Sequence, residues 1–362
     1  MPRVVFVLGE TAAGGAENQC RYLLEALRGR GLELELVYFR RGGQHERFEA
    51  LGIPLHEVPA RSRLALDLHR RARYLRPVVR ARDPDILHTW MYEAHQVALV
   101  AAGSRPRARM LLSHRSSGML PGERRQIAAL RLLRRRVDHI VANSGLGAEF
   151  IADQVGIAAD RVSVIPNGIP AARVAVGRDR QAIRRELGIA DDVPVVCSVG
   201  VIDQRGKDHS TVFAAMADVW SALPSAELLL VGPTADQVER LLGTPLPPRV
   251  RALGWHPGPA ELMNAADVVA VHSRTEGHSN VAGEALMLGL PVATTDTGGH
   301  PALVRDAGGR VVPVGRGASL GRAIVDLVRR PPSRGAVSEV AREALSMGTV
   351  ASSFVNLYEK LL

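Results

Sequence analysis

Short apolar runs alternate with stretches of helical periodicity along the whole chain. Apolar residues recur at helical spacing over 17–28, 66–81 and 123–136, and these segments predict helices. Strands that alternate with helices in this way are typical of doubly wound parallel sheets. The runs that predict strands are 4–8, 32–39, 55–58, 86–88, 110–114, 139–142 and 162–165, followed by 195–199, 227–231, 250–253, 268–271, 292–294 and 310–312.

The segment IPNGIPAARVAVGRD (165–179) interrupts this alternation, because it holds Pro, Asn and Gly without periodicity. A chain of 362 residues suits two domains of roughly 150–200 residues each, so we place a linker in this segment. The predicted fold class is α/β, with two Rossmann-like doubly wound parallel-sheet domains facing across a cleft. The predicted divisions are 1–168, 169–349 and a final helix at 350–362, whose packing partner the pattern leaves open.

The net charge of +9 comes almost entirely from Arg, since Lys occurs only at 207 and 360. Eight Arg and one Asp occur in 61–82, and six Arg occur in 124–136, interleaved with apolar residues at helical spacing. The simpler interpretation is two solvated amphipathic helices. The alternative is a surface for anionic lipid headgroups or a phosphate-bearing substrate. Nucleic acid is not expected, because only 4% of residues are aromatic and no nucleic-acid-binding motif occurs.

Targeting and redox signals are few. No apolar run approaches the roughly 18 residues that a membrane span needs. The two cysteines, Cys20 and Cys197, suggest neither a disulfide framework nor a zinc site. Asp83-Pro84-Asp85 has the D-x-D form of a metal-binding motif, but it precedes a predicted strand and reads as a turn. We therefore expect a cytoplasmic protein without a bound metal, with peripheral contact at an anionic inner membrane face left open, as is the oligomeric state.

The first strand–helix junction, LGETAAGGAEN (8–18), lacks both the G-x-G-x-x-G fingerprint and the P-loop. It places Gly14 and Gly15 at a helix N-terminus, where free N–H groups favour an anion. A plain tight turn explains this pair about as well.

Two histidines, His88 and His114, end predicted strands of the first sheet, with Trp90 and Arg115 beside them. In open parallel sheets, ligands bind beyond the carboxyl ends of strands. This shared position favours a ligand-binding edge over two isolated buried histidines.

In the second half, SVGVIDQRGKDHS (198–210) follows the first strand of its sheet. Arg205 and Lys207 flank Gly206 just before a predicted helix. A compact ammonium group suits a phosphate oxygen, so this loop is a candidate phosphate site rather than a solvated loop.

The stretch TEGHSNVAGEALMLGLPV (275–292) carries two glutamates, Glu276 and Glu284, around the start of a helix near Asn280. The helix N-terminus favours an anion, which two carboxylates would repel, so the carboxylates need other partners. Vicinal hydroxyl groups can each donate a hydrogen bond to a carboxylate. A ligand with a pyrophosphate in the middle and a polyol at each end, such as a nucleoside diphosphate sugar, fits this pattern.

Together with GGAENQCRYLLEAL, VANSGLGAEFI, VSVIPNGI, LLLVG and ALGW, this stretch resembles the retaining glycosyltransferases of family 4, which have the two-domain GT-B fold. The resemblance covers essentially the whole chain. It implies that Glu284 binds ribose hydroxyls, that Glu276 faces the donor sugar, and that the last helix crosses back to the N-terminal domain. It further implies that the backbone of Gly277, His278, Ser279, Asn280 and Val281, with Gly15, holds the pyrophosphate and that Leu253, Gly254 and Trp255 frame the base. Arg205 and Lys207 would neutralise the departing diphosphate, and His114 would lie beside the donor sugar. Gly14 and Gly200, which follow the first strands of their sheets, are further donor-site candidates, and Glu17, His88, Trp90 and Arg115 of the first half are the acceptor-side candidates.

The chain departs from the family's pattern at one loop. The family reads G-R-L-x-x-x-K-G, whereas Gly200 is followed here by Val201 and the basic residues are displaced by one position. Either Arg205 or Lys207 could therefore take the role of the phosphate-binding cation.

The expected activity is transfer of a hexosyl or N-acetylhexosaminyl group from a nucleotide sugar to an acceptor hydroxyl with retention of configuration. The resemblance favours front-face attack without a metal, and UDP is the first choice of donor nucleotide. The expected acceptor is a cell-surface polysaccharide or lipid-linked glycan. The alternatives are a small-molecule acceptor, a sugar-nucleotide epimerase or phosphorylase on the same scaffold, and a non-catalytic protein that binds sugar nucleotides.

Overall fold

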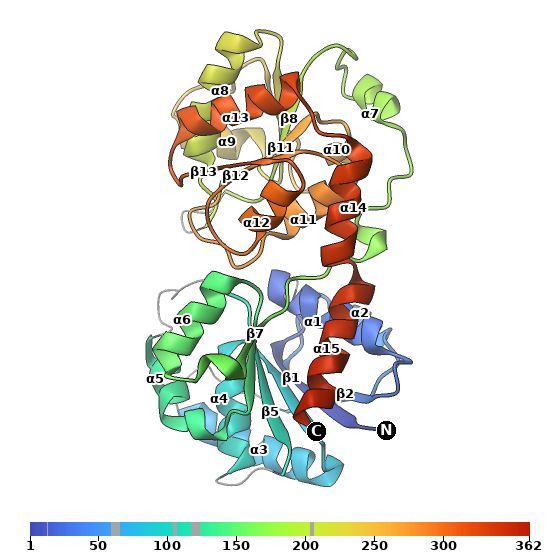
Figure 1. Cartoon of the computed structure of the whole chain (residues 1–362), viewed down its shortest axis with the longest axis vertical. Helices are drawn as coiled ribbons and strands as arrows, with labels where there is room; N and C mark the ends of the chain where they lie inside the picture. The colour runs from blue at the N-terminus through green and yellow to red at the C-terminus, as the bar shows by residue number, and fades with distance from the viewer. Residues whose placement is uncertain (13, 59–65, 104–106, 117–123, 203–205) are drawn as a thin grey trace. The chain divides into compact units, whose positions relative to one another are not determined.

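The computed structural model describes residues 1–12, 14–58, 66–103, 107–116, 124–202 and 206–362 (Figure 1). The chain divides into two compact units. Unit 1 comprises residues 1–168 and 347–362, and unit 2 comprises residues 169–346. The chain therefore leaves unit 1 once and returns to it for its last segment.

Unit 1 is built on a seven-stranded sheet in the order β3-β2-β1-β4-β5-β6-β7, and all its strand pairs are parallel. The central strands are almost continuously apolar, because helices cover both faces of the sheet. All seven strands predicted for the first half are present: β1 (Arg3–Glu10), β2 (Glu33–Arg40), β3 (Leu55–Glu57), β4 (Ile86–Trp90), β5 (Arg109–His114), β6 (His139–Ala142) and β7 (Val162–Val164).

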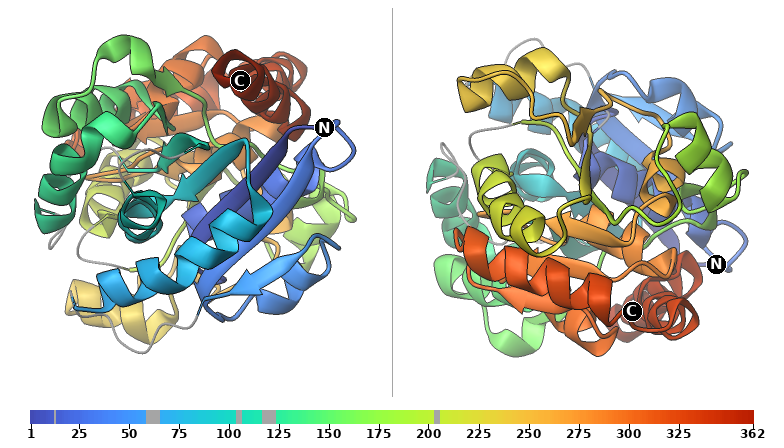
Figure 2. Two further views of the ribbon diagram at one scale, coloured as in Figure 1. Left: turned by 90° about the horizontal axis from the view of Figure 1, so that it is seen from below. Right: turned by 90° about the horizontal axis from the view of Figure 1, so that it is seen from above.

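Helices lie on both faces of the unit 1 sheet (Figure 2, left), and a separate apolar core joins each face to its helices. The core on one face includes buried residues of α3, α4, α5 and α6, and the core on the other face includes those of α1, α2 and α15. The helices are α1 (Gly15–Leu27), α2 (His45–Glu49), α3 (Leu66–Arg82), α4 (Met91–Ala102), α5 (Arg124–Leu133), α6 (Gly145–Val155) and α15 (Met347–Leu361), with short 3-10 turns at Arg134–Arg136 and Ala159–Arg161.

The last helix, α15, begins at Met347, three residues before the position expected from sequence. It lies beside α1 and buries Phe354 and Tyr358 in the core of unit 1. The guanidinium of Arg30 also donates a hydrogen bond to Ser352 Oγ of this helix at 2.9 Å. The end of the chain is thus an integral layer of unit 1.

Unit 2 has a six-stranded parallel sheet in the order β10-β9-β8-β11-β12-β13, with helices on both faces (Figure 2, right). The six predicted strands are present: β8 (Val195–Val199), β9 (Glu227–Val231), β10 (Val250–Ala252), β11 (Val268–Val271), β12 (Val292–Thr295) and β13 (Arg310–Val312). Its helices are α7 (Arg180–Glu186), α8 (His209–Ala222), α9 (Ala235–Leu242), α10 (Pro259–Asn264), α11 (Asn280–Met287), α12 (His300–Asp306), α13 (Gly317–Arg329) and α14 (Arg334–Leu345), with a 3-10 turn at Ala171–Arg173.

The segment predicted as a linker is shorter than expected. Only its first residues, up to Gly168, belong to unit 1, and the remainder is fixed within unit 2. The backbone N–H of Ile169 donates to Leu345 O at 2.8 Å, and Arg178 forms an ion pair with Glu261 at 2.6 Å. These contacts join residues far apart in sequence. The local sequence pattern therefore does not reveal them, and the segment resembles a linker.

The strand order reverses once in each sheet. In unit 1 the reversal lies between β1 and β4, and in unit 2 it lies between β8 and β11. Loops that leave adjacent strands toward opposite sides separate at such a point, so ligands bind there in open α/β sheets. The prediction of two Rossmann-like α/β domains is confirmed, and it identifies these two edges as the places to look for a site.

Candidate active site

At the carboxyl edge of the unit 2 sheet, the loops that follow β8 and β11 are joined to each other. Lys207 and Ser273 form an isolated antiparallel bridge, and the N–H of Arg274 donates to Gly206 O at 2.8 Å. The N–H of Asp208 donates to His272 O, also at 2.8 Å. The backbone therefore holds the two loops in a fixed register.

The side chains of these loops converge on Glu276. Lys207 Nζ lies 2.9 Å from Glu276 Oε2, and Ser273 Oγ donates to the same oxygen at 3.0 Å. The stem of Lys207 passes over Gly200, where a Cβ atom would lie 3.2 Å from Lys207 Cε. Gly200 has φ 148°, so this position needs glycine for its backbone conformation as well as for the approach of the lysine.

This cluster rests on buried polar groups. Asp208 caps α8 by accepting hydrogen bonds from Thr211 and also pairs with Arg274 at 2.9 Å. Next to it, His272 Nε2 lies 2.6 Å from Ser198 Oγ. Burial, followed by the nearby His209 and Lys207, lowers the pKa of His272 to about 3. His272 is therefore neutral at physiological pH and supports the loop without adding charge.

Helix α11 begins at this edge with its first backbone N–H groups at the carboxyl end of β11. Ser279 is the N-cap, and its Oγ accepts a hydrogen bond from Ala282 N at 3.3 Å. The loop after β12 packs against the same segment, where Gly299 N donates to Gly277 O at 2.8 Å. Gly298 has φ 77°, and a Cβ there would lie 2.6 Å from Glu276 O. The helix N-terminus is thus preorganised, which favours an anion.

His278 and His300 lie side by side behind this segment, with ring centroids 6.5 Å apart. His300 Nε2 is 2.8 Å from Thr294 Oγ1. Burial, followed by the nearby His278 and Lys207, lowers the pKa of His300 to about 3. His300 is thus another neutral support for the loops of this edge.

Glu284 lies on α11 with its side chain only 4% exposed. Both Nε and one terminal nitrogen of Arg173 lie 2.8 Å from Glu284 Oε1. Burial raises the pKa of Glu284, and Arg173 opposes that shift. Sequence analysis did not find this pairing, because Arg173 is in the segment interpreted as a linker. The clearest sequence signal for this pairing is that Arg173 lies among residues without helical periodicity.

The predicted base-site residues follow β10. Gly254 has φ 68° and exchanges backbone hydrogen bonds with the turn after β9: Gly232 N donates to Gly254 O, and Gly254 N donates to Pro233 O. Trp255 is 76% exposed. An aromatic side chain so exposed beside two preorganised turns is suited to stacking on a planar ring.

In unit 1, Gly14 is the N-cap of α1, as the junction predicted. The carboxylate of Glu17 folds back to Gly14, so a Cβ at Gly14 would collide with Glu17 Oε2. Burial raises the pKa of Glu17. An anion at this helix N-terminus would therefore have to displace or protonate Glu17.

His88 and Trp90, predicted on the acceptor side, are inside unit 1. His88 is 0% exposed and has Nδ1 2.8 Å from Tyr358 Oη and Nε2 2.8 Å from Ser113 Oγ. Trp90 Nε1 donates to Ala16 O at 2.8 Å. These contacts make both residues parts of the core under α15.

Arg115 likewise has contacts within the fold. Its guanidinium lies 4.5 Å from the ring centroid of Trp90 and donates to Ile165 O at 3.1 Å. His114 ends β5 and is 1% exposed, with its ring stacked on Phe150. Burial lowers the pKa of His114 to about 4, against the effect of the Ser116 backbone, so the imidazole is neutral.

Sequence analysis missed an ion-pair cluster at the β1/β4 reversal of unit 1. Arg40 lies 2.6 Å from Glu93 and 3.1 Å from Glu10, and Arg71 also binds Glu93. Burial alone would raise the pKa of Glu93, but Arg40 and Arg71 outweigh it and hold the pKa below its usual range. Met91 follows β4 with φ 67°, a strained conformation for a bulky residue that is typical of functional loops.

Two further predictions concern the basic pair Arg205 and Lys207 and the D-x-D sequence at 83–85. Arg205 lies outside the described residues, whereas Lys207 lies in the cluster. The D-x-D sequence connects α3 to β4 at the amino end of that strand: Asp83 has φ 42°, and Asp85 Oδ2 accepts from Arg3 N at 2.7 Å. Within the described ranges, no group of three or more His, Cys, Asp or Glu side chains could hold a metal ion. No helix in the same ranges is long and apolar enough to cross a membrane.

Two doubly wound parallel-sheet units, each with one reversal of strand order, define the class of proteins with two Rossmann-like domains. Family models agree: residues 13–173 match Glycosyltransferase Family 4, and residues 179–344 match Glycosyl transferases group 1. The chain therefore belongs to the family 4, group 1 glycosyltransferases with the GT-B fold, which confirms the resemblance seen in the sequence.

Curated relatives are similar over different shares of their length. A GDP-mannose-dependent monoacylated alpha-(1-6)-phosphatidylinositol monomannoside mannosyltransferase of Corynebacterium glutamicum is 28% identical over 280 residues, 72% of each chain. The lipopolysaccharide core biosynthesis glycosyltransferase LpsE of Rhizobium meliloti is 27% identical over 96% of each chain. The D-inositol 3-phosphate glycosyltransferase of Nocardia farcinica is 34% identical over 47% of this chain, an alignment that spans 40% of that relative's length.

A solved structure shares the fold. The Anabaena protein HepE in complex with UDP superposes with a TM-score of 0.84 over 99% of this chain and 100% of that one, at 22% identity. HepE was also solved with UDP-glucose, and that structure superposes with a TM-score of 0.81. These similarities establish the two-domain architecture.

Proposed function

We propose that this protein transfers a sugar from a nucleoside diphosphate sugar to an acceptor hydroxyl with retention of the anomeric configuration. The observation that carries the proposal is the joined loop cluster at the β8/β11 reversal. There a cation, Lys207, and a carboxylate, Glu276, meet at 2.9 Å beside the N-terminus of α11. This combination suits a ligand with a diphosphate next to a polyhydroxylated ring.

The donor fits this edge in three parts. The backbone N–H groups at the start of α11 receive the diphosphate, since a helix N-terminus favours negative charge. Glu284 receives the ribose hydroxyls, and Trp255 stacks on the base. HepE, which shares the fold, was solved with UDP and with UDP-glucose, and this supports UDP as the first nucleotide to test.

The chemistry follows from where charge develops. The bond between the anomeric carbon and the diphosphate oxygen breaks, and its electron pair leaves with the diphosphate. Lys207 and the α11 N–H groups stabilise that growing negative charge. The acceptor oxygen attacks the anomeric carbon on the face that the diphosphate leaves, and its proton passes to a diphosphate oxygen. Glu276 stabilises the positive charge on the sugar ring, and no metal is required.

We further propose an acceptor that carries a phosphate or belongs to a lipid-linked glycan. By their names, relatives act on a phosphatidylinositol mannoside, on inositol 3-phosphate and in lipopolysaccharide core synthesis. The Arg40, Arg71 and Glu93 cluster supplies guanidinium groups at the carboxyl edge of the unit 1 sheet. A small-molecule acceptor is the alternative.

A thermal-shift panel of UDP, GDP, ADP, dTDP and their sugars tests the donor. A ligand at 100 times its Kd should stabilise the fold by about 2.7 kcal/mol, so the true donor should raise the Tm clearly. Turnover with that donor should then fall by roughly 10²–10³ in Lys207→Ala and in Glu276→Ala, the scale seen when one charge-stabilising group is removed. Native-like turnover in both variants would refute the assignment, and epimerised donor without acceptor would indicate an epimerase instead.

A further inference from the structure

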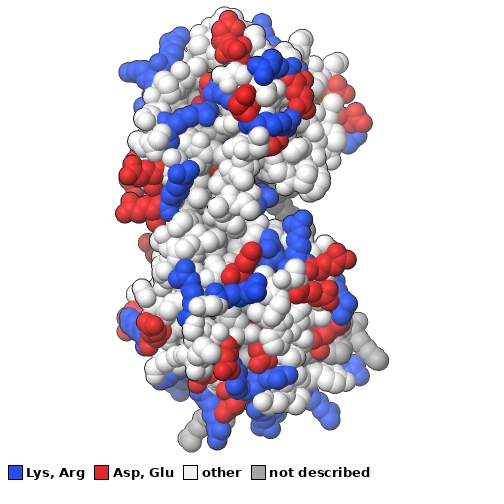
Figure 3. Space-filling model, turned by 90° about the vertical axis from the view of Figure 1, so that its right-hand side faces the viewer, with Lys and Arg blue, Asp and Glu red and all other residues white. Residues whose placement is uncertain are grey.

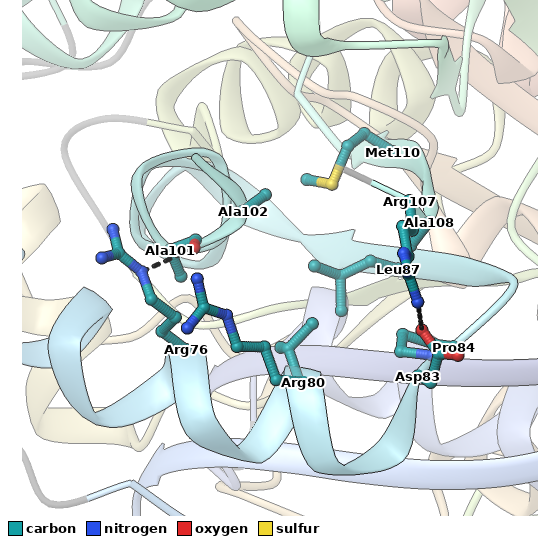
Figure 4. Close-up of a pocket in the computed structure, with 11 residues that line it drawn as sticks. Arg76, Arg80, Asp83, Pro84, Leu87, Ala101, Ala102, Arg107, Ala108 and Met110 are labelled. Carbon is teal, nitrogen blue, oxygen red and sulfur yellow. Dashed lines mark hydrogen bonds and ion pairs between the residues drawn. The ribbon is translucent and has the colours of Figure 1, made fainter. Parts of the chain in front are cut away.

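A cavity of about 410 Å³ lies at the amino-terminal edge of the unit 1 sheet, between the last turns of α3 and α4 (Figure 4). Asp83, which precedes β4, and Arg107, which precedes β5, complete its lining. Parallel strands place their carboxyl ends at the opposite edge, so the cavity is separate from the loops at the β1/β4 reversal. Its volume falls within the roughly 300–1,000 Å³ of small-ligand pockets.

The wall between the charged groups of the cavity is apolar. Val79 of α3 and Ala102 of α4 are half-buried lining residues, and the fully buried Leu87 and Met110 lie between the charged groups in Figure 4. Helix α4 ends with two small side chains, Ala101 and Ala102, and these leave the space between the helices open. An apolar wall of this size suits one ring or a short alkyl group.

The fold uses the arginines of the cavity unequally. Arg76 donates to Ala101 O at 3.1 Å and so offsets the negative end of α4. Arg107 lies 3.9 Å from Asp83, but both side chains are mostly exposed, and an ion pair of that kind contributes little. Arg80 forms no hydrogen bond or ion pair with any other residue that the structure describes. The guanidinium groups of Arg80 and Arg107 are therefore available to an external anion.

The positive charge of the cavity is a local feature. Three arginines and one carboxylate line it, which leaves a formal charge of 3 − 1 = +2. Acidic and basic side chains are interspersed over the face of unit 1 that Figure 3 shows, so the surface of this unit is not uniformly basic. A hollow with its own positive charge and an apolar wall favours a ligand that combines negative charge with an apolar group.

We propose that this cavity binds a small soluble molecule that carries one aromatic ring and one phosphate or carboxylate group. The planar guanidinium forks of Arg80 and Arg107 bind the anionic oxygens, for which arginine geometry is well suited. The ring lies against the apolar wall of Val79 and Ala102, and the arginine planes stack on its face. The proposal goes beyond the donor chemistry, because the cavity shares no residue with the unit 2 loops or with the ion-pair cluster of unit 1.

Titration of the full chain with phenyl phosphate tests the proposal by NMR. Methionine methyl groups labelled with carbon-13 are the reporters, because Met110 lines the cavity. Its signal is assigned from its absence in Met110→Leu, a volume-conserving substitution. The signal should shift saturably as phenyl phosphate is added. Inorganic phosphate lacks the ring and benzyl alcohol lacks the charge, so each should displace phenyl phosphate only at concentrations at least about tenfold higher.

Two cavity variants and a matched control locate the binding. Arg80→Ala should raise the Kd of phenyl phosphate by about tenfold, the scale of one charge-assisted hydrogen bond. Ala102→Leu fills the cavity without altering any charge and should weaken binding as well, with a native thermal midpoint showing that it folds. Arg73→Ala removes an exposed arginine of the same helix that does not line the cavity, and it should bind like the native chain.

The outcomes that would overturn the proposal are separate from those that test sugar transfer. A Met110 signal that does not move, native affinity in both cavity variants, or an equal loss in Arg73→Ala would each overturn it. Competition by inorganic phosphate or benzyl alcohol at the concentration of phenyl phosphate would refute the proposed ligand class. Lys207→Ala should leave the titration unchanged, and an equal loss there would assign the probe to the edge of unit 2 instead.

Discussion

Replacing Glu284 by Gln should separate ligand binding from stability. Burial raises the pKa of Glu284 above 4.5, so the folded chain holds this proton more tightly than the unfolded chain. The ionised carboxylate therefore lowers the free energy of unfolding. This loss is absent below pH 4.5 and increases as the pH rises from 4.5 through the raised pKa. Gln removes this cost, and Arg173, 32% exposed, remains accessible to water. We expect a Tm at pH 7.5 no lower than that of the native protein.

The binding loss can be worked from the same geometry. Arg173 occupies Glu284 Oε1, and Oε2 accepts no hydrogen bond from another described residue. Two ribose hydroxyls bound to this carboxylate would each contribute about 1.5–3 kcal/mol, against about 0.5–1.5 kcal/mol for a neutral acceptor. The change to Gln should cost about 2–3 kcal/mol, or roughly 30- to 150-fold in Kd.

Isothermal titration with the best nucleoside diphosphate of the thermal-shift panel measures this loss. The same nucleotide without its 2′ and 3′ hydroxyls should bind the native protein more weakly than the complete nucleotide does. Its affinity for Glu284→Gln should be no lower than its affinity for the native protein. Glu227→Gln is the matched control, since Glu227 also pairs with an arginine, Arg251, but at the amino end of β9. Native affinity in Glu284→Gln, or an equal loss with both nucleotides, would refute the ribose role.

Three other predictions follow from the site. Without Arg173, the pKa of Glu284 should rise further, so nucleotide affinity in Arg173→Gln should begin to fall at a higher pH on acidification; identical Kd profiles from pH 5 to 8 would contradict this. Transfer should persist in excess EDTA, and complete loss reversed by Mg²⁺ or Mn²⁺ would revive a metal site. Gly298→Ala should destabilise the fold, because the new Cβ would lie 2.6 Å from Glu276 O. The loss should be roughly 1–3 kcal/mol larger than in Gly315→Ala, since Gly315 has a similar φ but open space around it. Equal thermal midpoints of the two variants would contradict this prediction.

Most of the fold could be predicted because its strands carry a strong local signal. Buried parallel strands are nearly continuous apolar runs bounded by turn residues, as β1 and β11 illustrate. The carboxyl-edge loops could also be predicted, since Glu276 and Lys207 lie in the segments that follow such strands. What the pattern could not show is that Lys207 meets Glu276, because this contact depends on the backbone bridge between Lys207 and Ser273, 66 residues apart.

The unexpected features depend on contacts between distant segments. His88 follows the pattern of an exposed edge residue, but Tyr358, 270 positions later, covers it. Arg173 lies among Pro, Ala and Val without periodicity, and its partner is 111 residues away. Neither pairing leaves a trace at short sequence separation, so neither could be found without the tertiary structure.

The return of the chain to unit 1 has a consequence for biosynthesis. Unit 1 begins at the first residue but is completed only by α15, at the end of the chain. Translation proceeds at roughly 5–20 residues per second, so the 178 residues of unit 2, from 169 to 346, delay that helix by roughly 10–35 s. Unit 2 is contiguous and can complete its core first. A nascent chain therefore presents the apolar surface around His88 and Trp90 to chaperones and proteases until α15 covers it, and a chain terminated before α15 presents it permanently.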